Sequence, residues 1–189
     1  MKSLVYIVFM AALFSACAAS KEKKTDKYYF EHEQEIQEII SLYKSLYKHQ
    51  PFSLGFSDRS YEHIGMDIIT DTVRYAIDNL QSMQIFREAV YAFEYDTVAI
   101  RNLYRKMYDI KCIWVGTTDI YYKGEKEDVI FLTFRSVRFG NPFLDRKYYT
   151  LVIFDPRFIN AETDRLIREV GYKNVKNEIY FSIVEKFRM

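Results

Sequence analysis

The sequence predicts an α+β protein in which N-terminal helices pack on one face of a C-terminal, mostly antiparallel, four-stranded sheet. Between positions 28 and 108, apolar residues recur at steps of three and four, which is helical spacing. After Asp109 the chain changes to β-branched and aromatic runs separated by turn-forming residues, which is typical of strands. Helices first and strands afterwards favour an arrangement with the helices segregated to one face of the sheet.

Helical patterns fill most of the first half of the chain. The segment from about Tyr28 to Gln50 is predicted as one amphipathic helix that ends at Pro51, and its apolar stripe consists of Ile36, Ile39, Ile40, Tyr43, Leu46 and Tyr47. Residues 52–71 mix turn formers with short apolar pieces and predict a loop with room for one short strand or helical turn. One kinked helix or two consecutive helices are expected from Thr72 to Glu94. Asp96 or Thr97 can cap a further helix that runs through Tyr108.

Four strands are predicted in the second half, at residues 110–122, 128–139, 147–155 and 178–188. The segment Lys123–Glu127 contains a glycine and has the length of a hairpin loop, and a helix over Ala161–Val170 separates the last two strands. Short links make antiparallel neighbours the economical solution for the first three strands. This order of elements resembles the NTF2-like and cystatin-like folds, and the resemblance implies a curved, cone-like sheet.

The first twenty residues, MKSLVYIVFMAALFSACAAS, have the layout of an export signal. The apolar core Leu4–Phe14 would make a helix of about 16 Å, too short to cross the roughly 30 Å hydrocarbon layer of a membrane. Residues 13–17, Leu-Phe-Ser-Ala-Cys, resemble the lipobox of bacterial lipoproteins. The resemblance implies that the sulfur of Cys17 carries diacylglycerol and that the chain is cut just before it. The alternative is an ordinary secretory signal that is cut near Ser15 or Ala16.

The lipobox divides the chain into a signal peptide (1–16), a lipidated cysteine with a polar tether (17–27) and one α+β domain (28–189). A membrane, reached through the lipid, is then the first partner. The outer membrane is favoured because Ala18 is not the aspartate that some lipoproteins use for retention in the inner membrane. Cys112 would have no partner for a disulfide in the mature chain and is expected to be a buried, inert thiol.

Composition and motifs exclude several classes of function. Loss of Lys2 with the signal leaves 26 basic and 26 acidic side chains, and this balance argues against a nucleic-acid binder. The sequence contains no G-x-S-x-G or S-x-x-K nucleophile motif and no glycine-rich phosphate loop. Its three histidines lack the spacing of a zinc site, so neither a metal nor a cofactor is predicted.

Polar residues on the central strands form the candidate ligand-binding site. Residues two apart in a strand share a face, so a hairpin that turns near Glu125 would place Asp119 and Arg135 on the same face. The predicted surface lies away from the helices and consists of Thr117, Asp119, Tyr121, Thr133 and Arg135. Arg135 would meet an acidic or polar ligand group, and Tyr121 or Tyr149 would offer a flat apolar face. The alternative is a half-solvated sheet with ordinary cross-strand polar pairs.

These features predict a lipid-anchored protein of the cell envelope that binds another protein or a small ligand without catalysing a reaction. One alternative is a hydrolase that acts on an envelope or glycan substrate through a pair of carboxylates. Another is an inhibitor or immunity protein that blocks a toxin at the membrane.

Replacement of Cys17 by alanine is expected to abolish incorporation of labelled palmitate and to release the protein from the membrane fraction. The reason is that each buried CH₂ group of the acyl chains contributes about 0.8 kcal/mol to membrane binding. The matched control is Cys112→Ala, which removes the other cysteine and should leave labelling unchanged. A Cys17→Ala protein that still takes up palmitate would contradict the prediction.

Overall fold

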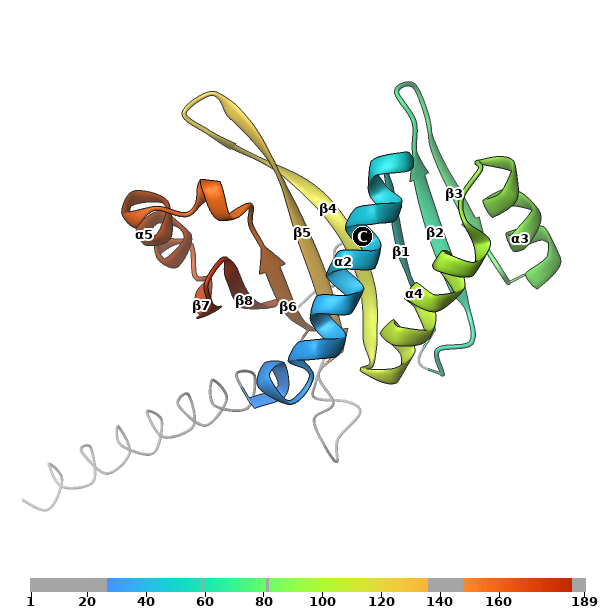
Figure 1. Ribbon diagram of the computed structural model, residues 1–189, viewed down its shortest axis with the longest axis horizontal. Helices are drawn as coiled ribbons and strands as arrows, with labels where there is room; N and C mark the ends of the chain where they lie inside the picture. The colour runs from blue at the N-terminus through green and yellow to red at the C-terminus, as the bar shows by residue number, and fades with distance from the viewer. Residues whose placement is uncertain (1–26, 59, 81, 136–147, 185–189) are drawn as a thin grey trace, which may run out of the picture.

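The computed structural model describes residues 27–58, 60–80, 82–135 and 148–184 of the 189-residue chain (Figure 1). These residues form helices and one antiparallel eight-stranded sheet with the strand order β3-β2-β1-β4-β5-β6-β8-β7. The helical elements are α2 (Glu33–His49), α3 (Met83–Ala92), α4 (Thr97–Asp109), the 3-10 turn η1 (Pro156–Phe158) and α5 (Ala161–Glu169). The strands are β1 (Phe52–Phe56), β2 (Ile64–Ile69), β3 (Arg74–Asp78), β4 (Cys112–Tyr122), β5 (Glu125–Arg135), β6 (Tyr148–Ile153), β7 (Lys173–Lys176) and β8 (Ile179–Val184).

The protein is therefore of the α+β class, but the predicted four-stranded sheet is wrong, and so is the NTF2-like or cystatin-like cone drawn from it. Strands β1, β2 and β3 occupy residues 52–78, which were expected to be a loop and the start of a helix. β1 and β3 escape a search for alternation because every residue of β1 is buried and most of β3 is exposed. β2 does alternate, with Ile64, Met66 and Ile68 buried. The short strand β7 was also not predicted.

The helices α2 and α4 lie across one face of the sheet, which we call the helix face (Figure 1). The predicted apolar stripe of α2 is buried there, and Asp96 caps α4 as expected, its carboxylate accepting hydrogen bonds from the N–H groups of Val98 and Ala99. Strand residues that share this core include Leu54, Val115, Leu132, Leu151 and Phe181. The hydroxyl of Tyr43 on α2 donates to the carbonyl oxygen of Phe52 at 2.6 Å, which ties the helix to β1.

The opposite face of the sheet, which we call the open face, carries a second and smaller core beneath α5. Its buried members are Val129, Val152, Phe154, Ile167 and Tyr180. Of these, Ile167 comes from α5 and the others come from β5, the β6 region and β8. The helix α5 therefore covers only the end of the open face near β8, and the middle of that face has no helix over it (Figure 1).

In the described residues, no helix is both long enough and apolar enough to span a bilayer.

The central hairpin of β4 and β5 turns through two residues, not through the predicted five-residue loop. Tyr122 pairs with Glu125, and the turn residues Lys123 and Gly124 both have positive φ, 51° and 84°. Positive φ at both positions defines the type I′ turn, whose twist matches that of the flanking strands. The turn fixes the pairing of the two longest strands in the sheet, eleven residues each.

Tight packing joins the two halves of the sheet where β1 meets β4. The indole ring of Trp114 lies against the backbone of Gly55, so that a Cβ atom added to Gly55 would come within 2.0 Å of the ring. Gly65, which pairs with Gly55 across β1 and β2, has no atom nearer than 3.9 Å to the corresponding position.

The pair Gly55 and Gly65 gives a matched test of this packing. Gly55→Ala is expected to lower the free energy of unfolding by about 1–3 kcal/mol, because the new methyl group forces the indole or the backbone to move. Gly65→Ala should not lower it by more than about 0.5 kcal/mol, because the new methyl group would lie 3.9 Å from its nearest neighbour, the carbonyl oxygen of Ile77. Urea denaturation of both variants measures the difference, and equal stabilities would contradict the packing described.

Candidate functional site

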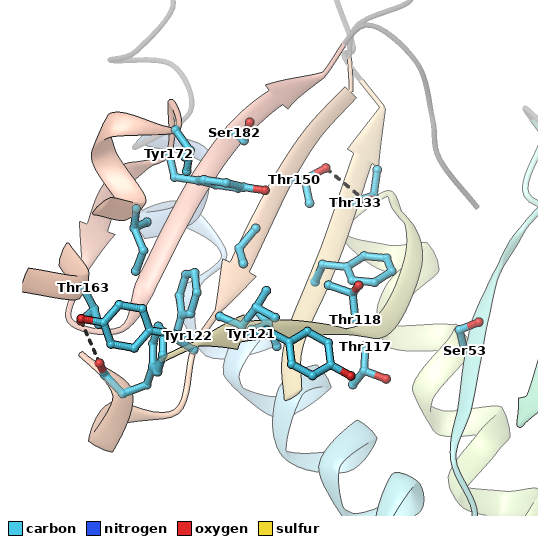
Figure 2. Close-up of a pocket in the computed structure, with 18 of the residues that line it drawn as sticks. Ser53, Thr117, Thr118, Tyr121, Tyr122, Thr133, Thr150, Thr163, Tyr172 and Ser182 are labelled. Atoms are coloured by element: carbon cyan, nitrogen blue, oxygen red, sulfur yellow. Dashed lines mark hydrogen bonds between the residues drawn. The ribbon is translucent and has the colours of Figure 1, made fainter. Parts of the chain in front are cut away.

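A pocket of about 830 Å³ is hollowed in the open face between the central strands and α5 (Figure 2). This volume is within the usual range for small-molecule sites, about 300–1,000 Å³. Ten of its lining residues carry a hydroxyl group: Ser53, Thr117, Thr118, Tyr121, Tyr122, Thr133, Thr150, Thr163, Tyr172 and Ser182. Eleven are apolar: Ile69, Trp114, Ile120, Val129, Phe131, Val152, Phe154, Phe158, Leu166, Ile167 and Val170. Among the described residues, Arg74 is the one charged member of the lining.

The floor of the pocket is built by the register of four strands. Residues that pair across an antiparallel sheet point to the same face, so each row of partners lies side by side. One row consists of Trp114, Thr133, Thr150 and Ser182, and it places three short hydroxyl side chains next to each other. The hydroxyl oxygens of Thr133 and Thr150 are 3.4 Å apart and form a hydrogen bond (Figure 2).

The next row is apolar and consists of Gly116, Phe131, Val152 and Tyr180. Gly116 leaves space for the Phe131 ring, since a Cβ atom at Gly116 would lie 2.8 Å from the tip of that ring. The two rows are two residues apart along each strand. Between them, the side chains on the floor of the pocket change from mostly hydroxyl-bearing to mostly apolar. This pattern suits a molecule with one polar and one apolar part.

The helix α5 forms one wall of the pocket, to which Leu166 and Val170 contribute apolar side chains. Its first turn is fixed by a capping box in which the side chains of Asn160 and Thr163 each accept a hydrogen bond from the other residue's backbone N–H. The Thr163 hydroxyl also donates to the carbonyl oxygen of Phe158 at 2.8 Å (Figure 2). These bonds hold the wall in a defined position before any ligand arrives.

A buried tyrosine attaches α5 to the sheet. The hydroxyl of Tyr180 on β8 donates to the carboxylate of Asp164 on α5 at 2.6 Å. Burial of the Tyr180 side chain, followed by its hydrogen bond to Asp164, raises the pKa of its hydroxyl to about 12. Hydrogen bonds from Arg168 and then from Tyr180 lower the pKa of the Asp164 carboxyl. At neutral pH the pair is therefore a neutral phenol bound to a carboxylate, which is a strong type of hydrogen bond.

Charge is confined to one part of the lining. Arg74 is on β3, and its guanidinium forms an ion pair with the carboxylate of Asp67 on the neighbouring strand.

The thiol of Cys112 is free and buried within the core of the helix face. Burial raises the pKa of this thiol to about 12, so it stays protonated at neutral pH.

Of the four predicted ligand-binding residues, Asp119, Tyr121 and Tyr149 do not come together, and the side chain of Arg135 lies outside the part of the chain that the structure describes. Asp119 is exposed on β4 and forms an ion pair with Lys126 at 3.2 Å. Tyr121 is 74% exposed and lines the pocket at its rim (Figure 2). Tyr149 packs against the core of the helix face, on the other side of the sheet from the pocket. Arg135 is the last residue of β5 and pairs with Tyr148, while the predicted lipidation site, Cys17, lies outside the described residues.

The predicted shared face of Asp119 and Arg135 is wrong because the turn lies earlier than expected. The hairpin pairs Asp119 with Asp128, an even-numbered residue, whereas a turn centred on Glu125 would pair it with an odd-numbered one. Such a shift in register exchanges the two faces of a strand. Of the five residues in the predicted surface, Thr117, Tyr121 and Thr133 line the pocket, and Thr133 belongs to its floor.

Most residues on the floor of the pocket, and all residues of its α5 wall, were not predicted from the sequence. A signal was present in the strand sequences, because Thr150, Val152 and Phe154 alternate in β6 and its extension, as Tyr180 and Ser182 do in β8. These residues could be assigned to one face, but the sequence does not say that α5 folds back over that face.

Among the described residues, no group of three or more histidine, cysteine, aspartate or glutamate side chains is placed to hold a metal ion. Comparisons of the chain with protein-family models, with curated proteins and with solved structures each find no match.

Proposed function

We propose that this protein is a lipid-anchored binding protein of the bacterial cell envelope, whose pocket on the open face takes an uncharged, partly apolar small molecule. The observation that carries this proposal is the composition of the lining, in which hydroxyl and apolar side chains make up all but one of the positions. The export signal and the lipobox-like segment before Cys17 support the location.

An uncharged ligand fits the hydroxyl groups on the floor. A charged group that leaves water needs a partner of opposite charge, and without one the cost is several kcal/mol. The one cation of the described lining, Arg74, is paired with Asp67 and belongs to the edge strand β3, three strands away from β4, the nearest strand of the floor. The hydroxyl groups of Thr133, Thr150 and Ser182 can each donate and accept, which suits alcohol, ether, carbonyl or amide groups.

An apolar body fits the rest of the pocket. Phe131 and Val152 on the floor face the same space as Leu166 and Val170 on the wall. A ligand that buries about 200 Å² of hydrocarbon there gains about 5 kcal/mol, before the costs of association are subtracted. Because the wall and floor are fixed by hydrogen bonds within the protein, little further ordering is needed on binding.

Two fluorescent probes that differ by one charge test the proposed selectivity. N-phenyl-1-naphthylamine is uncharged, and 8-anilino-1-naphthalenesulfonate has the same aromatic skeleton with an added sulfonate. The chain from residue 27 onward, prepared without the lipid-bearing segment so that no detergent is needed, is expected to bind the uncharged probe at least about tenfold more tightly, because the sulfonate would lose its hydration without gaining a free cation. Equal affinities, or preference for the sulfonate, would contradict the proposal.

A variant that fills the pocket tests where the probe binds. Thr118 is an exposed residue of the lining, so Thr118→Trp should reduce binding of N-phenyl-1-naphthylamine by about tenfold or more with little change in stability. Asp128→Trp is the matched control, because Asp128 is also exposed but does not line the pocket. Probe titration and thermal melting of both variants are needed. If the two variants bind equally well, the pocket is not the site.

A further inference from the structure

The edge strand β3 turns unused main-chain hydrogen-bonding groups away from the sheet. In the β2–β3 hairpin, the N–H of Asn79 donates to the carbonyl oxygen of Ile64 at 3.1 Å, and the N–H of Thr70 donates to that of Val73 at 2.9 Å. Main-chain groups alternate along a strand, so odd-numbered residues of β3 face β2. Arg74, Ala76 and Asp78 therefore point their N–H and C=O groups outward, and within the described residues these groups make no hydrogen bond.

The two edges of the sheet differ in how well they are protected. Strand β7, at the far edge, has four residues, begins and ends with lysine and has an irregular register with β8, and such features discourage pairing with another chain. Strand β3 has a regular register and contains neither lysine nor proline. Every residue of β3 except Ile77 is exposed, including the central Ala76.

The sequence of this edge, Arg-Tyr-Ala-Ile-Asp, is complementary to itself. If a second copy of β3 pairs in the antiparallel sense about a two-fold axis at Ala76, Arg74 lies opposite Asp78 of the other copy at both ends of the pair. Arg74, Ala76 and Asp78, whose main-chain groups point outward, are the residues that pair in this register. Each pair can exchange two main-chain hydrogen bonds. The guanidinium of Arg74 has five N–H donors, so it can keep Asp67 and add the second aspartate.

Apolar side chains flank the same edge. Val73 precedes β3 and is 47% exposed, and Leu80 follows it and is 58% exposed. In the antiparallel register, Val73 of one copy approaches the segment that contains Leu80 of the other. Pairing would therefore cover hydrocarbon as well as main-chain groups.

We infer that β3 is a dimerisation edge, through which two copies of this chain join their sheets into one continuous antiparallel sheet across a two-fold axis at Ala76. The inference does not depend on the proposed ligand, because it rests on β3 and the residues beside it, although Arg74 also lines one end of the pocket.

A cysteine at the axis tests the register directly. Cα atoms of a hydrogen-bonded antiparallel pair lie about 5.5 Å apart, which is a favourable separation for a disulfide. The full-length Ala76→Cys protein, treated in its own membranes with copper phenanthroline, should give a disulfide-linked dimer on a non-reducing gel. Ala92→Cys, at an exposed position on α3, is the control and should remain a monomer. If Ala76→Cys gives no more dimer than Ala92→Cys, the inference is wrong.

Charge reversal tests the complementarity. In the Ala76→Cys background, Arg74→Asp gives a copy with two acidic ends, and Asp78→Arg gives a copy with two basic ends. Each alone should lose about tenfold or more of the cross-linked dimer, since like charges then face each other. When the two are coexpressed with different tags, the mixed dimer should form at the level of the parent. The inference would be overturned if each variant alone gave as much cross-linked dimer as the parent. It would also be overturned if the coexpressed pair gave as little mixed dimer as each variant gives alone. Arg101→Asp on α4 controls for the change in net charge.

Discussion

The pairing of β4 with β5 determines which side chains enter the core and which line the pocket. A two-residue turn at Lys123 and Gly124 sets this register, and the register assigns every residue of the two longest strands to one face or the other. Val115 and Leu132 go to the core beneath α2 and α4, while Phe131 and Thr133 go to the open face. A shift of β5 by one residue relative to β4 would place hydroxyl groups in the core and leucine in the pocket.

The same pairing explains why the open face has a pocket at all. The helices α2 and α4 pack on the helix face, and α5 covers the open face only at its end over β6 and β8. The edge of α5 then makes a wall, and the uncovered rows beside it make a floor. The bond from Tyr180 to Asp164 holds this wall to the sheet, and it is strongest while the carboxyl is ionised, that is above the lowered pKa of Asp164.

Parts of the fold with a strong local signal were predictable from the sequence. The stripe on α2, the Asp96 cap of α4, the region of the four later strands and the helix α5 all follow from periodicity and capping chemistry. The strands β1 and β3 did not follow, because their exposure pattern reflects tertiary neighbours: β1 is buried on both faces and β3 lies at an edge. In β2 the alternation of buried Ile64, Met66 and Ile68 was a signal that the prediction missed. The candidate site was predicted only in part, because its faces depend on a turn whose position the sequence leaves open to within a residue or two, as the pairing of Asp119 shows.

We propose that an uncharged ligand occupies the open face and not the helix face. Hydrogen–deuterium exchange of the protein with and without N-phenyl-1-naphthylamine tests it most directly, since it locates protection along the backbone. We expect slower exchange in β5, β6, β8 and the last turn of α5, and no change in α2. Protection confined to α2 and α4, or none at a probe concentration that saturates the fluorescence, would contradict it.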